Sequence, residues 1–458
     1  MNPLTYKSPD ERTAPAAAAV SPLRSLKARL LQADRPLFAL FQSVGTQALI
    51  TAINVLTGVM TARMLGADGR GVYTAVSTWP QLFATLAVAG LNSAVVYRLR
   101  KSPERRVGIT GAAVVLCLAS ALICAAVGVL LLPFLMDRYT PAIVLFSQIC
   151  LVSVMVNSLQ MLIKQTFAGM GEFARCNLAN LLPQALYLFA LLAVVIVVPA
   201  TARNAVLALL GSGAIALLAA LPGFIRLARP GFKAAMQELP QLASYSGRAW
   251  LMDVVFTTAT YMDRLVLIPM LSPAQLGFYG VAFSFSRVIL LSQPAILSVM
   301  LSHMSGRAAL ERRRMHDHAL RFLVAALLVG CALLWMVGEP LLTFTYGAEF
   351  AAASTLFRLL VIEASLAVLS QVTAQLFLSG DRPGVVSIIQ VVVLGISIAL
   401  LLVLVPLYGA VGAALGLMAA GLIRWMLFLA ATRLILRFPL PRLYLVRDDF
   451  RYILGLLR

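Results

Sequence analysis

Long apolar stretches alternate with short polar ones along most of this chain. Each stretch has at least 18 residues, and a bilayer core about 30 Å thick needs about 20 helical residues at a rise of 1.5 Å each. Lipid cannot form hydrogen bonds to open backbone, so the stretches are predicted to be helices. The pattern predicts an all-α polytopic membrane protein with about 12 transmembrane helices, over residues 38–62, 72–97, 108–135, 141–163, 176–199, 204–225, 249–271, 277–302, 319–338, 352–378, 384–407 and 409–432.

Three short motifs recur in the second half of the chain at nearly equal offsets. Met64–Tyr73 aligns with Met270–Tyr279 at an offset of 206. Two further pairs follow at offsets of 210 and 207, namely Gln165–Gly169 with Gln375–Ser379 and Val198-Pro199 with Val405-Pro406. We therefore expect two six-helix lobes related by a parallel internal repeat, with the substrate path between them. Gly66, Gly71 and Gly277 are expected to allow tight turns or close backbone approach.

The repeat and its flanking polar stretches divide the chain into five segments. They are a cytoplasmic N-terminal segment with an interfacial amphipathic helix (1–37), an N-lobe of helices 1–6 (38–225), a cytoplasmic linker (226–248), a C-lobe of helices 7–12 (249–432) and a cytoplasmic amphipathic tail (433–458). Leucines at helical spacing between Pro22 and Gln32 predict the interfacial helix. The first 37 residues lack the architecture of a signal peptide.

Composition and charge define the class and the orientation. Hydrophobic residues make up 61% of the chain and charged residues 12%, which excludes a soluble enzyme. Of the 37 basic residues, 28 lie on the side that holds both termini and four lie on the opposite side. The positive-inside rule therefore places both termini in the cytoplasm. The net charge of +19 lies mostly in short loops beside helix ends, where anionic lipid headgroups attract basic side chains. The expected partner of these loops is therefore membrane lipid and not nucleic acid.

The sequence favours a transporter over an enzyme. The five cysteines lie in or beside apolar stretches without the paired spacing of metal ligands. The segment His316-Asp317-His318 lies among arginines and is interpreted as a solvated turn. The outward loops are short, and the motifs of hydrolases, zinc proteases and nucleotide-binding loops do not occur. No cofactor and no bound metal are therefore expected.

Polar residues form a stripe along the first predicted helix. Its members fall within an arc of about 80° at 100° per residue and are Ser43, Gln47, Thr51, Asn54, Gly58 and Thr61. Such a stripe either binds packed helices together or faces a water-filled cavity, and its length favours the cavity. Gln47, Thr51 and Asn54 are therefore candidate substrate contacts. The first six helices offer no base at mid-membrane, because Lys164 is predicted at the inner edge of its stretch.

Ionisable residues interrupt the apolar stretches of the second half. Each such charge costs about 2.5–3.5 kcal/mol at mid-membrane and requires a partner, a hydrated cavity or a ligand. Guanidinium groups form bidentate hydrogen bonds to phosphate. The candidate contacts to an anionic substrate are therefore Arg264, Arg287, Arg358 and Arg424. The candidates for coupling a proton or sodium ion are Asp253, Asp263 and Glu363. Arg287 could alternatively pair with Asp263 or Glu363, and Arg424 could reach the headgroups.

Four segments carry a resemblance to a known family, namely Leu65–Tyr73, Met262–Leu267, Leu276–Ala282 and Gly409–Ala414. In this order and spacing they resemble the bacterial polysaccharide exporters, which are lipid-linked oligosaccharide flippases of the multidrug/oligosaccharidyl-lipid/polysaccharide exporter superfamily. The resemblance runs from about residue 38 to residue 436. It implies a bacterial inner-membrane protein with a cavity between two lobes, alternating access and cation coupling.

The implied substrate is a polyprenyl-diphosphate-linked oligosaccharide that moves from the cytoplasmic to the periplasmic leaflet. The resemblance carries over to Arg264 and Arg287 as cavity cations, and it makes polysaccharide polymerase and assembly proteins candidate partners. The alternatives are a cation-coupled drug or small-molecule exporter of the same superfamily, a transporter of the major facilitator type, and a membrane-embedded glycosyltransferase or ligase subunit. The signature turn of the major facilitators does not occur in the loop Arg98–Val107.

Overall fold

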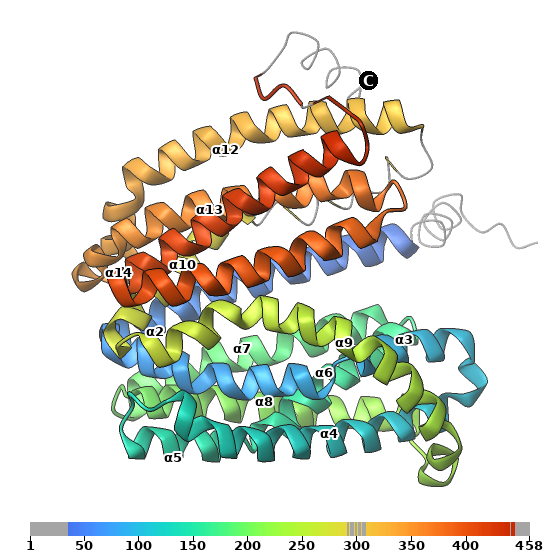
Figure 1. Ribbon diagram of the computed structural model, residues 1–458. Helices are drawn as coiled ribbons and strands as arrows, with labels where there is room; N and C mark the ends of the chain where they lie inside the picture. The colour runs from blue at the N-terminus through green and yellow to red at the C-terminus, as the bar shows by residue number, and fades with distance from the viewer. Residues whose placement is uncertain are drawn as a thin grey trace, which may run out of the picture.

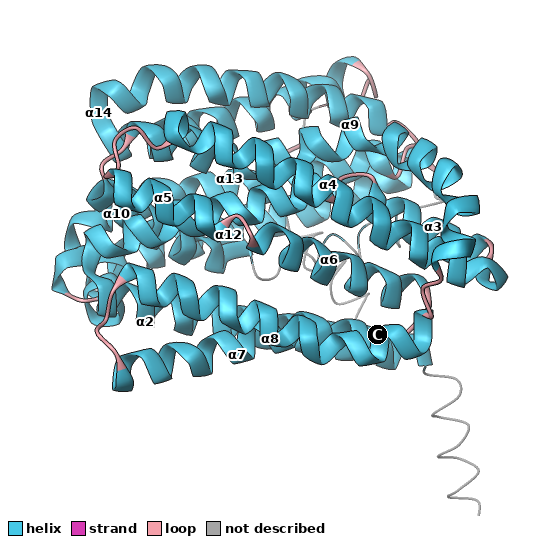
Figure 2. Ribbon diagram, turned by 90° about the horizontal axis from the view of Figure 1, so that it is seen from below, coloured by secondary structure: helices cyan, strands magenta, loops and turns pink. Residues whose placement is uncertain are grey.

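The computed structural model describes residues 35–290, 308–439 and 441–444, together with positions 293, 297, 300 and 304. Within these residues the regular structure is helical and contains no strand (Figure 2). The all-α prediction is therefore confirmed. The interfacial helix predicted within residues 22–32 and the end of the tail, residues 445–458, lie outside the described residues.

The helices follow the apolar stretches. They are α2 Arg35–Ala87, α3 Leu91–Lys101, α4 Arg106–Leu135, α5 Pro141–Cys150, α6 Ser153–Gly169, α7 Phe173–Val197, α8 Ala202–Ala228, α9 Phe232–Met270, α10 Pro273–Ser286, α12 Ala309–Tyr346, α13 Ser354–Leu378 and α14 Pro383–Leu434. Short 3-10 helices follow α3, α10 and α12, namely η1 Pro103–Arg105, η2 Arg287–Leu290 and η3 Ala348–Ala353.

The helices form two stacks that lie one above the other in Figure 1. The stack with α4 to α8 corresponds to the N-lobe, and the stack with α12, α13 and α14 corresponds to the C-lobe. Helices α2 and α9 lie where the stacks meet: α2 packs against α7 and α10, and α9 packs against α4 and α14. The two expected lobes are therefore present, and their interface is built mainly by α2, α9 and α10.

The predicted number of 12 separate helices is not confirmed. Eight stretches of the described helices are long and apolar enough to cross a membrane. Two of them, α2 and α14, each join two predicted spans, and in each of them two helices meet at a glycine whose φ and ψ are not helical. Gly66 has φ 66° and Gly409 has φ 58°, a left-handed conformation that glycine adopts without strain. A Cβ on Gly412 would lie 1.9 Å from the carbonyl oxygen of Leu404, so the chain turns back at Gly409, and the expected junctions are tight turns between helices.

The lobes touch closely at the end of the molecule that carries the turn at Gly66, here called the outer end. A Cβ on Gly71 would lie 1.7 Å from the carbonyl oxygen of Pro273, and a Cβ on Gly277 would lie 2.0 Å from that of Ala67. Both glycines lie inside helices, so they serve close approach and not turns. Arg63 Nε adds a hydrogen bond of 2.7 Å to the carbonyl oxygen of Thr345.

Most of the expected linker is helical. The helix α9 begins at Phe232, and its first turns pack against α3 and α4. Buried Glu238 forms ion pairs with Arg98 and, at 3.3 Å, with Arg105. The polar stretch is therefore the start of a long helix that ion pairs hold against the N-lobe. Its apolar content is too low for the hydrophobic pattern to predict it as part of a membrane-spanning helix.

Large apolar side chains are exposed around the outside of the bundle. Examples are Leu130 at 71% exposure, Phe134 at 80%, Ile196 at 82% and Met336 at 79%. A protein surface in water rarely exposes so many large apolar side chains, whereas a surface in contact with lipid does. The exposed belt therefore agrees with a multi-pass membrane protein.

Candidate functional site

A cavity of about 140 Å³ lies inside the C-lobe and gathers most of the predicted charges. It is enclosed by residues of α9, α10, η2, α13 and α14. Its polar lining residues are Thr260, Asp263, Arg287, Glu363, Gln390, Ser397 and Arg424. The structure therefore brings Asp263, Arg287, Glu363 and Arg424 together from four different elements.

Two carboxylates and two guanidinium groups balance each other in this cavity. Arg287 Nη1 lies 2.9 Å from Glu363 Oε2, and Arg424 Nη2 lies 3.9 Å from Glu363 Oε1. The hydroxyl of Tyr279 donates a hydrogen bond of 2.9 Å to Asp263 Oδ2. Only 7% of the Glu363 side chain is exposed, and an unpaired charge at such a place would be costly. Glu363, and not Asp263, is thus the partner of Arg287.

A change of helix type positions Arg287 beside Glu363. The α-helix α10 ends at Ser286, and the chain continues as the 3-10 helix η2, which packs against α13. The tighter winding rotates the following side chains relative to those of an α-helix. The Arg287 guanidinium also lies 4.0 Å from the ring centre of Phe283, and this contact stabilises a cation away from bulk water.

Two predicted residues of α9 lie apart from this cavity. Asp253 Oδ2 accepts a hydrogen bond of 2.8 Å from the backbone N–H of Gly90, at the break between α2 and α3. Ten residues separate Asp253 from Asp263, about 15 Å along a helix. Asp253 therefore lies apart from the other two candidates for ion coupling, Asp263 and Glu363. Arg264 lies against the ring of Tyr261, 5.9 Å from its centre.

The polar stripe of the first predicted helix is partly exposed. Gln47 and Asn54 are exposed, and Thr51 is half-buried and donates to the carbonyl oxygen of Gln47 at 2.9 Å. Farther along, Thr61 is buried and accepts a hydrogen bond from Arg70. Only the outer part of the stripe therefore packs against protein. Gln47 and Asn54 do not bind helices together in this structure.

A second cavity, of about 200 Å³, lies in the N-lobe and was not predicted. Its walls come from α2, α6, α7 and α8, and Tyr261 of α9 closes it toward the C-lobe. Lys164 is the charged residue among its lining residues, and we call this space the Lys164 cavity. The polar lining residues are Ser77, Gln81, Asn157, Gln160, Lys164, Asn180, Gln184 and Ser212.

The sequence contains a signal for this cavity. Asn157, Gln160 and Lys164 are spaced i, i+3 and i+7, which places them on one face of α6. Asn180 and Gln184 share a face of α7 in the same way. Because α6 continues to Gly169, Lys164 lies more than one turn inside the helix and not at its edge. Searching for polar faces in every helix would have found it.

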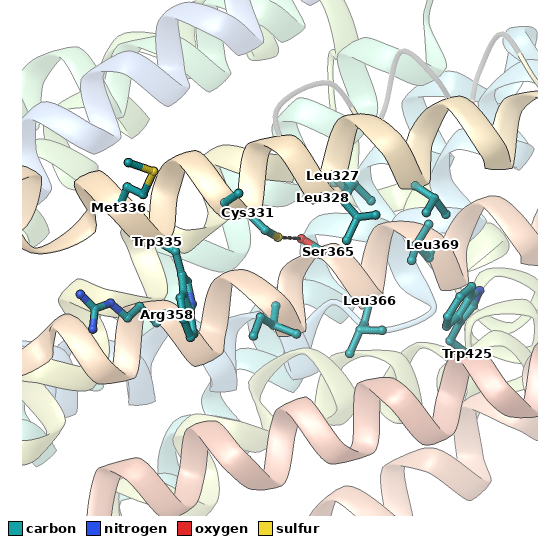
Figure 3. A pocket seen from close by; sticks show the side chains of 13 residues that line it. Leu327, Leu328, Cys331, Trp335, Met336, Arg358, Ser365, Leu366, Leu369 and Trp425 are labelled. Atoms are coloured by element: carbon teal, nitrogen blue, oxygen red, sulfur yellow. Dashed lines mark hydrogen bonds between the residues drawn. The ribbon is translucent and has the colours of Figure 1, made fainter. Parts of the chain in front are cut away.

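A larger, apolar groove of about 820 Å³ lies between α12, α13 and α14 (Figure 3). Leu327, Leu366 and Leu369 line its length, and Arg358 marks one end beside Trp335. The Arg358 guanidinium lies 5.7 Å from the ring centre of Trp335 and 3.9 Å from a carboxylate oxygen of Glu339. Arg358 is therefore separate from the charged cluster of the C-lobe cavity.

Across the described part of the chain, no group of three or more His, Cys, Asp or Glu residues could hold a metal ion. His316 is buried and lies 3.2 Å from an Asp317 carboxylate oxygen, so this residue pair is not a fully solvated turn. The five cysteines are free, and Cys331 Sγ lies 3.0 Å from Ser365 Oγ in the apolar groove.

Several solved structures share this fold. The lipid II flippase MurJ in an inward closed conformation matches with a TM-score of 0.71 at 12% identity, covering 91% of each chain. A multidrug resistance MATE family transporter of the MOP superfamily in its inward-facing conformation matches with a TM-score of 0.64 at 14% identity, covering 83% of this chain and 93% of that chain. An outward-facing MATE structure matches at 0.56 and 13% identity, covering 87% and 95%. At such identities the likeness shows the fold alone.

The sequence itself matches one family profile. Among curated protein sequences, none matches this chain. Residues 60–355 match the profile of a family described as polysaccharide biosynthesis protein, which covers more than half of the chain. This chain therefore belongs to the polysaccharide biosynthesis protein family, and it has the fold of the MOP-superfamily transporters.

Proposed function

We propose that this protein moves a polyprenyl-diphosphate-linked oligosaccharide from the cytoplasmic to the periplasmic leaflet of the bacterial inner membrane, during the biosynthesis of a surface polysaccharide. The family match over residues 60–355 supports the pathway. The observation that carries the direction of transport is the way in which the two lobes meet.

The lobes share a buried apolar core that reaches the outer end. Of the hydrophobic clusters among the described residues, one contains residues of both lobes, and it includes Ala67 and Leu276 beside the close contacts of that end. The fold also matches the inward-facing MATE structure better than the outward-facing one. A molecule closed at its outer end accepts substrate from the cytoplasmic side, where a lipid-linked glycan is assembled.

The cavities fit an anionic amphiphile better than a cationic drug. The C-lobe cavity has balanced charges, and the Lys164 cavity has a cation and no carboxylate among its lining residues. An organic cation would meet no uncompensated acid in either space. The apolar groove with Arg358 at one end offers a path for a lipid chain. These features favour a glycolipid over the substrate of a multidrug exporter.

Within this proposal Asp263 is the remaining candidate for ion coupling. It is buried, and its partner among the described residues is the neutral hydroxyl of Tyr279, whereas Glu363 is held by Arg287. A buried acid with a neutral partner can exchange a proton or a sodium ion at lower cost than one in an ion pair. Asp263→Asn should therefore abolish coupled export while the protein level is maintained.

Deletion of the gene followed by lipid extraction tests the proposal. The deletion strain should accumulate a polyprenyl-linked oligosaccharide that is inaccessible to glycan-cleaving enzymes added to spheroplasts. Re-expression of the wild-type chain should clear it. A deletion strain with unchanged lipid-linked glycans and normal surface polysaccharide would contradict the proposed function.

A further inference from the structure

The two polar cavities occupy corresponding places in the repeated lobes but differ in charge. The offset of 206 relates Arg287 to Gln81, and each lines the cavity of its own lobe. The offset of 210 relates Lys164 to Ala374, which is buried in the apolar core of the C-lobe. The repeat has therefore placed the cation of the N-lobe on a different helix from the arginines of the C-lobe.

Lys164 has no compensating charge among the residues that the structure describes. The other walls of the cavity contribute carboxamide, hydroxyl and apolar side chains. The nearest acid along the chain is Glu172, just before α7, and it pairs with Arg175 at 3.4 Å. On α9, Asp253 is bound to the backbone of Gly90. In contrast to Arg287, Lys164 thus has no carboxylate partner among the described residues.

The carboxamides around Lys164 are also available. Within the described chain, the side-chain amides of Gln81, Asn157 and Gln184 make no hydrogen bond to protein, although they line the cavity. Gln160 and Asn180 are the exceptions, since the amide of Gln160 donates to the carbonyl oxygen of Gly213 and that of Asn180 donates to Cys176 Sγ at 3.9 Å. A lysine ammonium with free amides around it can bind an oxyanion through the N–H groups and neighbouring hydroxyls through the amide oxygens.

The position of the cavity connects it to the path between the lobes. Tyr261 of α9 forms the wall toward the C-lobe, and Arg264 packs on the ring of the same tyrosine. A second cation therefore lies just behind that wall. At about 200 Å³, the cavity is smaller than the sites of about 300–1,000 Å³ that hold whole drug-sized ligands. It fits one anionic group with its adjoining sugar hydroxyls.

We propose that the Lys164 cavity binds an oxyanion of the transported glycolipid, with Lys164 as the charged contact and Gln81, Asn157 and Gln184 as hydrogen-bonding neighbours. This assignment rests on the proposed function. The oxyanion comes from either the diphosphate linkage or an acidic sugar, because both present the same chemistry to an ammonium group.

Calorimetric titration of the purified full-length chain in detergent tests this site. Farnesyl diphosphate with farnesol as its uncharged control reports on the diphosphate, and glucuronate with glucose reports on an acidic sugar. Lys164→Gln should weaken binding of the anionic probe by about tenfold or more, and Lys164→Arg should restore most of it. Lys233→Gln removes an exposed lysine of α9 and should change nothing. The probe that responds to Lys164→Gln identifies the source of the oxyanion.

The outcomes separate the site from the proposed function. Equal affinity of wild type and Lys164→Gln for both probes, or no binding of either probe to wild type, would overturn the site. If Lys164→Gln does not fold, Gln184→Leu takes its place, because it leaves the charge intact and should still weaken the probe severalfold. A deletion strain that accumulates lipid-linked glycan and is fully complemented by Lys164→Gln rejects the site alone. A deletion strain without accumulation rejects the proposed function.

Discussion

Replacing Glu363 with glutamine should destabilise the C-lobe more than any other single change in its cavity. The substitution keeps the shape of the side chain but leaves Arg287 and Arg424 without their shared counter-charge. At 2.9 Å and an effective dielectric constant of about 20, the gross attraction between Glu363 and Arg287 is roughly 6 kcal/mol. The 3.9 Å contact with Arg424 adds roughly 4 kcal/mol before desolvation is subtracted. Loss of one partner of a buried pair costs about 3–5 kcal/mol in practice.

A double-mutant cycle distinguishes a structural pair from a ligand site. The four proteins are wild type, Arg287→Gln, Glu363→Gln and the double variant, and the measurement is reversible unfolding in mixed micelles together with glycan export in the deletion strain. If the two residues hold the lobe together, the double variant should recover about 1–3 kcal/mol relative to the sum of the single changes. It should also export glycan better than Glu363→Gln alone, because its cavity is again neutral.

Additive losses of stability would refute this reasoning, since they would show that the two charges do not stabilise each other. Stable single variants in which only Arg287→Gln abolishes export would refute it in another way. Arg287 would then act on the substrate, and its contact with Glu363 would be secondary. Arg175→Gln is a suitable control, because it breaks an exposed ion pair with Glu172 that is expected to contribute less than about 1 kcal/mol.

Three further changes test the outer end and the groove. Gly71→Ala should lower the unfolding midpoint strongly, because its Cβ would meet backbone at 1.7 Å, whereas Gly58→Ala, with nothing within 4 Å, should not. Glu349→Ala removes a 3.0 Å hydrogen bond from the backbone N–H of Ala67, which follows the turn at Gly66, at a cost of about 1 kcal/mol, and should speed maleimide labelling of Thr345→Cys at the outer end. Leu366→Trp should fill the apolar groove and slow export without lowering the unfolding midpoint. Unchanged midpoint, labelling or export, respectively, would contradict each expectation.

The length and apolar content of the stretches made the helices predictable, since few structures other than helices satisfy their backbone in lipid. The junctions at Gly66 and Gly409 were predicted as breaks, and at each of them two helices meet at a single glycine with positive φ. The helical start of α9 was missed. Its apolar content is too low for a membrane span, and its stability comes from packing against α3 and α4.

The charged residues were easy to find and their partners were not. Arg287 and Glu363 stand out in the sequence because charged residues are rare in apolar stretches. Their pairing depends on the 3-10 helix η2 and on the register of α13, which no local pattern contains. The same limitation affected Lys164. Lys164 stands out because the other helices that line its cavity contribute no carboxylate among the lining residues. The sequence shows only which residues neighbour Lys164 along its own helix. Charge compensation is a tertiary property.

The repeat explains why the outer end closes as it does. The offset of 206 relates Ala67 to Pro273 and Gly71 to Gly277. The two close approaches, Gly71 to Pro273 and Gly277 to Ala67, are therefore the same contact made twice, once in each direction. Such reciprocal contacts are the mark of a two-fold axis between like surfaces. One duplicated motif thus supplies both sides of the closure, and any side chain larger than glycine at either position would hold the lobes apart at the outer end.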